Sequence, residues 1–315
     1  MGSCRIISII STLYCDIPRI PMDVCDNYSN WFTYQITTYQ VDIGTGQDSK
    51  TILLKLVFDA VWRSLFAPGK LVIMMADTGD EHEETLIHVQ HTKRFCKEHG
   101  IEFVHITPDM GFHRKSWQGL REHYVEYAQI GSKAFTKSCT ESLKLAPMGN
   151  FMDDWIGREF GYPSGRKRAI KRYVKEHGHK IVNLIGIAQG EESRVQDQSK
   201  QPDKWRRDCI EIRYPLIEFG LDRQACQDYM RRMDEVVPLP SNCILCPWMN
   251  EQELVWLYRF LPRDYSDWVA MERFKVQEDV KKYGPERKNL GVWAKTDKKT
   301  GKELWEYKMS HGIMI

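Results

Sequence analysis

The sequence predicts an α/β fold in which helices flank a parallel, twisted sheet. Residues 71–76 are a continuous apolar run, as expected for a strand that is covered on both faces, and residues 181–187 form another run typical of a buried strand. Helical patterns separate these runs, and such alternation implies right-handed crossovers between parallel strands. Polar clusters follow several strands, at the sheet edge where parallel sheets bind ligands. A helical C-terminal part carrying a Cys-x-x-Cys pair completes the predicted architecture.

The individual elements follow from hydrophobic periodicity and from turn residues. The predicted strands are 39–43, 71–76, 101–106, 181–187 and 210–214, with a further candidate at 5–13. The predicted helices are 49–65, 83–99, 115–127, 151–158, a helix that Asp222 caps, and 251–261. Polar residues 196–207 are predicted to form a mobile loop.

These elements divide the chain into four parts. We expect an unassigned N-terminal extension at 1–35, a nucleotide-binding α/β domain at 36–220, a helical part at 221–281 and a polar tail at 282–315. At 315 residues the chain is long enough for one large or two modest domains.

Composition restricts the partners of the protein. The net charge of +2 gives no global signal for polyanion binding, so any basic surface must be local. Such a surface is the segment 166–175, which is either a solvated amphipathic helix or a contact for nucleic acid. No apolar run is long enough to span a membrane and no signal peptide is evident, so we expect a cytoplasmic protein without membrane contact.

A small-residue loop links the first predicted strand to its helix. Its sequence, Gly44-Thr45-Gly46-Gln47-Asp48-Ser49, lets backbone N–H groups approach an anion at a helix N-terminus. It lacks the Gly-Lys-[Ser/Thr] ending of a Walker A loop and the three spaced glycines of a dinucleotide fingerprint. On local grounds, a phosphate site and an ordinary strand-to-helix turn are both open.

Cysteine usage favours a metal or cluster over disulfide bonds. Nine cysteines are scattered along the chain, and Cys243 and Cys246 form its one Cys-x-x-Cys pair. Cys139 lies between Lys137 and Lys144, whose charges favour the thiolate. Three cysteines can hold a [4Fe–4S] cluster, or zinc with a fourth ligand. A cluster, zinc and no metal at all are left open.

Charged side chains at the strand ends suit nucleotide binding. Asp48, Asp77 and Asp80 can hold Mg²⁺ beside a triphosphate, although capping and turn formation explain each of them equally simply. Lys144 and Arg194 can neutralise phosphate oxygens.

Taken in order, these motifs resemble those of the PP-loop ATP pyrophosphatases, the adenine nucleotide alpha-hydrolase-like (HUP-like) superfamily, and of its phosphoadenosine phosphosulfate (PAPS) reductase branch. The similar segments are Gly44–Ser49, Ala76–Glu81, Ser138–Thr140 with Lys144, Gly186–Ile187 with Glu192–Arg194, and Cys243–Pro247. The resemblance spans about residues 38–275. It departs from the family pattern at Gly44 and Thr45, where Ser and Gly are usual.

The resemblance implies a role for each matching residue. It assigns ATP binding to Gly44, Thr45, Gly46, Gln47 and Ser49, an adenosine pocket to Asp77, Thr78 and Gly79, catalytic roles to Asp48, Lys144 and Arg194, Mg²⁺ to Asp48 and Asp80, and a [4Fe–4S] cluster to Cys139, Cys243 and Cys246.

The resemblance allows three hypotheses for the function, and the cysteine nucleophile of the reductases helps to distinguish them. The reductases carry a cysteine near the C-terminus, whereas no cysteine follows Cys246 here. The chain is therefore closer to the sulfur-transfer members, which act in Dnd-type DNA phosphorothioation and tRNA thiolation. They imply ATP, Mg²⁺, a nucleic-acid or nucleotide acceptor and a sulfur donor such as a cysteine desulfurase, with a homodimer left open. A PAPS or adenylyl-sulfate reductase and a non-catalytic nucleotide-binding protein with structural zinc stay as alternatives.

Overall fold

A computed structural model describes residues 38–42, 46–131, 138–238, 243–249 and 251–284 of the chain. These residues belong to one unit of the chain, residues 37–315. The candidate strand at 5–13, the loop residues Gly44 and Thr45, and most of the polar tail lie outside the described residues.

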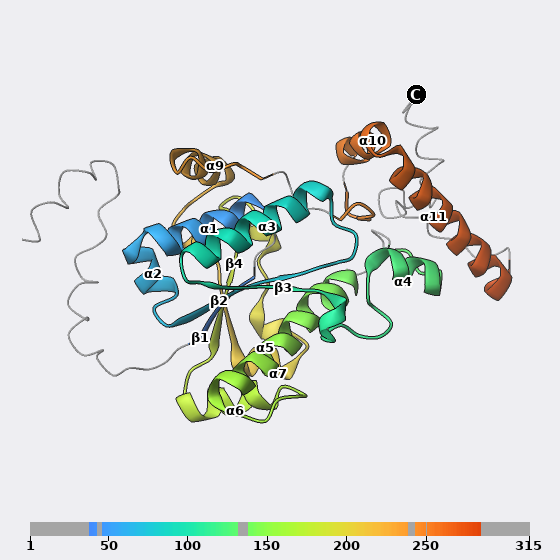
Figure 1. The fold of residues 1–315 in the computed structure, drawn as a ribbon. Coiled ribbons are helices and arrows are strands. Elements are labelled where there is room, and N and C mark those ends of the chain that lie inside the picture. Colours follow the sequence, from blue (N-terminus) through green and yellow to red (C-terminus); the bar gives the residue numbers. More distant parts are fainter. Residues whose placement is uncertain (1–37, 43–45, 132–137, 239–242, 250, 285–315) are drawn as a thin grey trace, which may run out of the picture. The chain divides into compact units, whose positions relative to one another are not determined.

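Five parallel strands form the central sheet, in the order β3-β2-β1-β4-β5 (Figure 1). Their bounds are β1 Thr38–Asp42, β2 Lys70–Ala76, β3 Glu102–Ile106, β4 Ile181–Ile185 and β5 Ile210–Arg213. In this register Val41 lies opposite Ile73 of β2 and Leu184 of β4. The predicted α/β class with a parallel sheet is thus confirmed. Strand order reverses between β1 and β4, where such sheets commonly open a ligand crevice.

Helices cover both faces of this sheet (Figure 1). One face packs against α1 (Gln47–Phe58), α2 (Ala60–Phe66), α3 (Glu83–Glu98) and α9 (Arg223–Arg232). The other packs against α5 (Ala146–Phe160), α6 (Arg168–His177) and α7 (Lys204–Cys209). Because β2 is sandwiched between the two layers, its last six residues are all buried, as the apolar run predicted.

A third apolar cluster joins the later helices. It combines α4 (Leu120–Tyr127), α10 (Glu251–Phe260) and α11 (Pro262–Tyr283) with the cysteine segment around Leu245. Trp268 and Leu257 are fully buried in it. The short remaining elements are the helices η4 Pro108–Met110, η6 Glu192–Arg194, η7 Gln198–Lys200 and α8 Pro215–Glu218, and the π-helix η5 Thr140–Leu145.

The structure corrects several predicted boundaries. The single helix predicted at 49–65 is two helices, because Asp59 ends α1 and its carboxylate accepts hydrogen bonds from Val61 N and Trp62 N at the start of α2. The helix predicted from 115 begins at Leu120, after the extended residue Gly119.

The prediction of a loop at 196–207 was also wrong, since η7 lies within this segment and α7 begins in it. Long-range contacts order this segment. Trp205 packs into the α5 layer, and Arg206 makes a bidentate ion pair with Glu141 at 2.7 and 2.9 Å. Helix α11 had not been predicted as a separate element. In contrast, Asp222 caps α9 as expected, accepting from Ala225 N at 2.7 Å.

No helix among the described residues combines the length and apolar character that a membrane crossing needs.

Candidate functional site

The first turn of α1 offers unused backbone donors at the sheet edge. Gly46 occupies the N-cap position in an extended conformation, and no side chain in the described part of the chain caps the helix. The first N–H groups of a helix lack internal partners and carry a partial positive charge. Asp48 and Ser49 are buried within this turn. The arrangement suits an anion such as a phosphate.

Gly186, directly after β4, allows this turn to approach the neighbouring strand. A Cβ atom at Gly186 would lie 2.7 Å from Ser49 N and 2.8 Å from Ser49 Oγ. Only glycine permits that contact without displacing the helix start. The Gly-Ile motif at 186–187 therefore contributes to the shape of the candidate phosphate loop.

Opposite charges surround Asp48. Arg223 lies 4.0 Å from its Oδ2, and Glu191 forms ion pairs with both Arg223 and Arg194. Burial raises the pKa of Asp48, and the charge of Arg223 opposes that rise. Oδ1 of Asp48 is buried without a hydrogen-bond partner in the described part of the chain. This oxygen is chemically suited to a bound cation.

The Gln47 side chain is hydrogen-bonded to α9, and its predicted role in ATP binding stays a prediction. Its Oε1 accepts a hydrogen bond from Gln227 Nε2 of α9 at 2.8 Å, and its backbone oxygen accepts from Thr51 Oγ1 at 3.0 Å. The first contact fastens α1 to α9, and the second lies within α1.

The second motif, at the end of β2, is held by its own hydrogen bonds. Asp77 Oδ1 accepts from Gly79 N at 2.8 Å, and His105 Nε2 lies 3.4 Å from Oδ2. Burial would raise the pKa of Asp77, but the bonds from His105 and Gly79 outweigh it and leave the pKa below its ordinary value. Asp77 is therefore a stable carboxylate at neutral pH. Its predicted place in an adenosine pocket stays a prediction.

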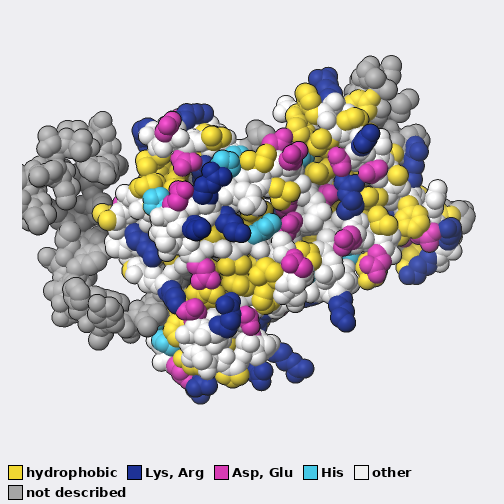
Figure 2. Space-filling model, in the orientation of Figure 1, with side chains coloured by type: hydrophobic (Ala, Val, Ile, Leu, Met, Phe, Trp, Pro, Cys, Tyr) yellow, Lys and Arg dark blue, Asp and Glu magenta, His cyan; other side chains and the backbone are white. Residues whose placement is uncertain are grey.

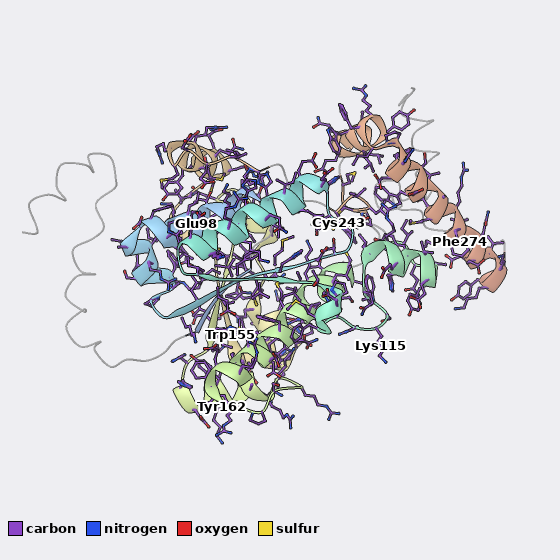
Figure 3. The ribbon with its side chains drawn as sticks, in the orientation of Figure 1. Glu98, Lys115, Trp155, Tyr162, Cys243 and Phe274 are labelled. Carbon is purple, nitrogen blue, oxygen red and sulfur yellow. The ribbon has the colours of Figure 1, made fainter. Side chains whose placement is uncertain are left out.

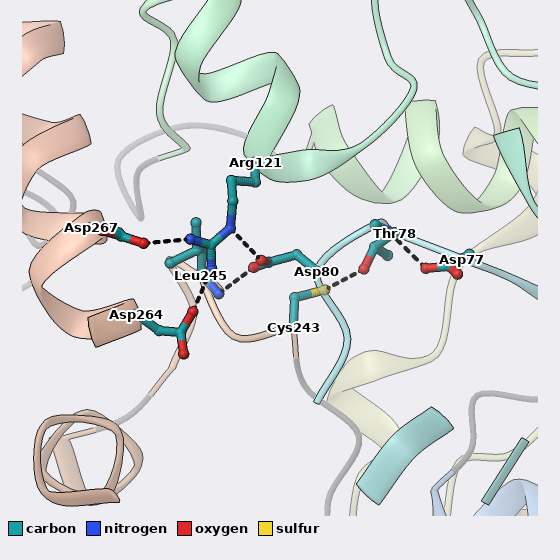
Figure 4. Close-up of polar contacts among 9 residues, drawn as sticks. Asp77, Thr78, Asp80, Arg121, Cys243, Leu245, Asp264 and Asp267 are labelled. Carbon is teal, nitrogen blue, oxygen red and sulfur yellow. Dashed lines mark hydrogen bonds and ion pairs between the residues drawn. The ribbon is translucent and has the colours of Figure 1, made fainter. Parts of the chain in front are cut away.

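Thr78 connects this motif to the Cys-x-x-Cys segment. Its Oγ1 donates to Glu81 Oε1 at 2.8 Å and lies 3.2 Å from Cys243 Sγ (Figure 4). Burial, together with the nearby charge of Glu81, raises the pKa of Cys243 to about 12. The free thiol thus stays protonated at neutral pH, so a metal that binds it must displace a proton.

Asp80 fastens the same segment to the sheet. Its Oδ2 accepts from Leu245 N at 2.7 Å, its Oδ1 accepts from Arg121 Nε at 3.1 Å, and its backbone oxygen accepts from Ile244 N at 2.8 Å. Burial raises its pKa to about 6. Both carboxylate oxygens are engaged in holding the cysteine segment, and a role in binding Mg²⁺ stays an untested prediction.

Arg121, which the sequence analysis did not single out, joins three parts of the chain at this point. Besides Asp80, its guanidinium binds Asp264 at 2.7 Å and Asp267 at 2.9 Å, both on α11 (Figure 4). An arginine in a predicted helix gives no local signal of such a role, because its three partners are distant in sequence.

The three predicted cysteine ligands gather in one cluster. Cys139, Cys243 and Cys246 all pack against the apolar cluster around Leu245. Figure 3 places Cys243 near the N-terminal end of α3 and the α10–α11 pair. Cys139 directly precedes the π-helix η5, a distortion that often marks functional sites.

Lys144 of η5 faces these thiols. Burial alone would lower its pKa, but the charges of Cys243, Glu81 and Cys246 when ionised raise it above the ordinary value. Lys144 therefore keeps its positive charge and can balance thiolates or an anionic ligand.

Tyr124 and Gly131 close the other side of the cysteine cluster. The buried hydroxyl of Tyr124 lies beside the Gly131 backbone without a hydrogen bond of good geometry. A Cβ atom at Gly131 would lie 2.8 Å from Pro247 Cγ and 3.0 Å from that hydroxyl. Glycine at 131 thus permits the backbone to pack closely against Pro247 and Tyr124 beside the cysteine segment.

The chemical types of the side chains around the cysteine segment suit a metal group that is bound through sulfur. Three thiols, a cation and a buried hydroxyl share one cluster. Among the described residues, however, no three histidine, cysteine, aspartate or glutamate side chains stand close enough together to grip a metal ion. The cysteines would have to draw together around a bound group.

The basic segment 166–175 largely coincides with α6, which the structure places on the face of the sheet opposite α1. Its N-terminus is held by buried Asp153, whose carboxylate accepts from Gly165 N at 2.6 Å and Lys167 N at 3.1 Å. Lys and Arg side chains lie on the surface around α6, which Figure 2 shows in the orientation of Figure 1.

Three comparisons place the chain among known proteins only distantly. No family model matches it, and no curated protein matches it. Among solved structures, it is similar to the U34-tRNA thiolase NcsA from Methanococcus maripaludis, solved with its [4Fe-4S] cluster. The two are 13% identical, the alignment covers 77% of this chain and 73% of the thiolase, and the TM-score is 0.38. At that distance the likeness assigns no family.

Proposed function

We propose that the protein is an ATP-dependent sulfurtransferase that activates an oxygen of a nucleotide or nucleic acid as an adenylate and replaces it with sulfur. The observation that carries this proposal is the direct contact between two motifs. Thr78, from the candidate nucleotide motif, lies 3.2 Å from the sulfur of Cys243, in the candidate cluster motif. This contact supports a nucleotide site and a thiol cluster that lie side by side, on two segments 165 residues apart in the sequence.

The proposed reaction has two displacements. In the first, the acceptor oxygen attacks the α-phosphorus of ATP, the bond from that phosphorus to the bridging oxygen breaks, and pyrophosphate leaves. In the second, a sulfur nucleophile attacks the activated carbon or phosphorus of the acceptor, and AMP departs with the original oxygen.

The residues of α1 would serve the first displacement. The unused amides of its first turn and Ser49 would bind the departing pyrophosphate, and Asp48 would hold Mg²⁺ through its unpaired Oδ1. Arg194 would neutralise developing charge after exchanging its contact with Glu191 for a phosphate oxygen.

The cysteine cluster would serve the second displacement. Cys139, Cys243 and Cys246 would hold a [4Fe–4S] cluster, which supplies an iron without a protein ligand for the sulfur chemistry. Lys144 would balance the negative charge of the thiolates, and Tyr124 would exclude water from one side. The acceptor and the sulfur donor, such as a cysteine desulfurase, belong to the proposal as well.

Anaerobic purification tests the cysteine half of this function. We expect a brown protein with about four iron and four sulfide per chain. Serine at Cys139, Cys243 or Cys246 should remove most of the iron. Cys209→Ala is the matched control, because Cys209 is buried in the α5 layer, outside the cysteine cluster. Zinc without sulfide would instead favour the structural-zinc alternative.

A pyrophosphate-release assay tests the nucleotide half. Wild-type protein is incubated with Mg·ATP and with tRNA, duplex DNA or a mononucleotide as acceptor. Acceptor-dependent pyrophosphate release is expected from one of them. Release of sulfite from adenylyl sulfate with a thiol donor, and none of pyrophosphate, would point to the reductase reading. ATP binding without any pyrophosphate release would overturn the catalytic proposal.

A further inference from the structure

A cavity lies on the α5 face of the sheet. It measures about 80 Å³, more than five times the roughly 15 Å³ that one water needs. Its walls are mainly apolar, with Leu145, Met148 and Met152 on one side and Trp205 on another. No residue from the first turn of α1, from Asp77–Glu81 or from Cys243–Cys246 lines it. The cavity is therefore distinct from the site proposed for ATP and the cluster.

Trp205 forms a fixed wall of this cavity. A Cβ atom at Gly149 would lie 3.0 Å from Trp205 Cη2, so the indole rests directly on the α5 backbone. Lys167 Nζ lies 5.0 Å from the ring centroid and also donates to Asn150 Oδ1 at 2.5 Å. The guanidinium carbon of Arg206 lies 5.3 Å from the same ring centroid, so neighbouring side chains hold the indole in place, and its remaining surface lines the cavity.

Unused amide groups stand at the same cavity. Gln198 is occupied, since its side chain bonds to the backbone of Ile210 and Ile212 along the edge of β5. Gln196 and Gln201 also line the cavity, and their side-chain amides make no hydrogen bond within the described residues. Each amide offers a donor and an acceptor side by side, which is the pattern that reads the edge of a nucleobase.

The outer surface near the cavity is positively charged. Arg166, Arg168, Lys171 and Lys204 are exposed, and none forms an ion pair with a carboxylate within the described residues. Of the nearby acids, Asp203 is paired with Arg206 and Asp208 is exposed. Exposed, unpaired cations beside an aromatic wall suit a sugar-phosphate chain whose bases stack on protein.

We propose that this cavity receives one unstacked base of a single-stranded nucleic acid, with the base against Trp205 and the amides, and the phosphates along α6 and α7. The inference deepens the proposed function and rests on its nucleic-acid acceptor. Arg206 connects the two sites, because it lines the cavity and grips Glu141 of η5, the π-helix that carries Lys144.

Fluorescence anisotropy with labelled 12-nucleotide RNA and DNA strands tests the proposal on the full chain. Trp205→Ala should weaken binding about ten-fold, as expected for loss of one stacked base, and Trp205→Phe should restore most of it. Gln196→Ala and Gln201→Ala, at exposed or half-buried positions, should each weaken binding several-fold without altering the melting temperature. Trp256→Ala is the matched control, because Trp256 is exposed on α10 and distant in sequence.

A strand of the same length built from abasic sugar-phosphate units separates base from phosphate recognition. Wild-type protein should bind it about ten-fold more weakly than the base-bearing strand, and Trp205→Phe and Gln201→Ala should not change its binding. Arg168→Ala and Lys204→Ala should weaken both strands equally. Equal affinity of the wild type for abasic and base-bearing strands, or no binding of either, overturns the inference.

These outcomes are distinct from failure of the proposed function. Pyrophosphate release with a mononucleotide, together with no preference for bases in a strand, would leave the sulfurtransferase and remove the base pocket. If the protein instead binds strands in a base-dependent way but holds no iron and cleaves no ATP, the base pocket would remain and the sulfurtransferase proposal would be removed.

Discussion

The two halves of the candidate site differ in how completely their polar groups are used. At the start of α1, the helix is uncapped and Asp48 Oδ1 has no partner within the described residues. At the cysteine segment, both carboxylate oxygens of Asp80 and all three nitrogens of Arg121 are engaged. Both carboxyl groups are buried and have raised pKa values, yet only one of them retains a free oxygen.

This difference separates groups that await a ligand from groups that hold the site in place. A buried polar atom without a partner costs free energy, which a ligand can recover on binding. A buried carboxylate that is already bonded on both oxygens stabilises the fold and has little left to offer a metal. We therefore expect ligand-dependent effects at Asp48 and ligand-independent effects at Asp80 and Arg121.

The largest effect should follow from Arg121→Gln. It leaves the buried carboxylate of Asp80 without its cation, and breaking such a pair costs about 4 kcal/mol. Chemical denaturation of the metal-free protein measures this loss. Asp267→Asn is the control, because the Asp267 side chain is 57% exposed and its ion pair contributes at most about 1 kcal/mol.

Arg121→Gln should also expose the cysteine segment. In the metal-free protein, mass spectrometry after iodoacetamide treatment should show faster alkylation of Cys243 and Cys246 than in the wild type, with Arg121→Lys in between. Equal alkylation rates in all three proteins would mean that Arg121 stabilises the fold without positioning the cysteines.

Magnesium dependence distinguishes the two aspartates directly. Mg·ATP at about one hundred times its dissociation constant should stabilise the wild type by about 2.7 kcal/mol. Asp48→Asn should lose the part of this stabilisation that needs Mg²⁺, whereas Asp80→Asn should keep it. Thermal denaturation with and without chelator measures both. The reverse pattern would show that Asp80 holds the metal, as the sequence motif suggested.

Gly186→Ala should damage the α1 half alone. The new methyl group would collide with Ser49 N and Oγ, and overpacking of this kind costs about 2 kcal/mol. Isothermal titration should show ATP binding at least ten-fold weaker, with iron content unchanged. Gly119→Ala is the control, since its Cβ would meet no atom closer than 3.6 Å. Unchanged ATP affinity in Gly186→Ala would place the phosphate elsewhere.

The sequence predicted the sheet well because its signals are local. Apolar runs such as 71–76 must be strands covered on both faces, and Asp222 is a helix cap that hydrogen bonding confirms. Cys139, Cys243 and Cys246 border one apolar cluster, and their prediction as cluster ligands, which came only from a resemblance of ordered motifs, stays a prediction.

The remaining features depend on contacts between distant residues, which no local pattern contains. The motif that contains Asp80 predicts a metal ligand, but the hydrogen-bond donors to its carboxylate, Leu245 N and Arg121 Nε, come from distant parts of the sequence. The polar sequence around Arg206 predicts a loop. In the structure this segment contains helix α7, and Arg206 of this helix forms an ion pair with the distant Glu141. Close approaches at Gly186 and Gly131 become visible only when the neighbouring backbone is known.

The last predicted effect is a pH dependence that the Asp80 carboxyl group should contribute. Its folded-state pKa of about 6 lies above the ordinary 3.8, so the folded protein holds a proton between those values that the unfolded chain has released. The free energy of unfolding of the wild type, relative to Asp80→Asn, should therefore fall as pH rises from about 4 to about 6 and stay level above. Its slope is at most about 1.4 kcal/mol per pH unit. Urea denaturation across this range measures it, and a difference that rises with pH would mean that Arg121 outweighs burial at this carboxylate.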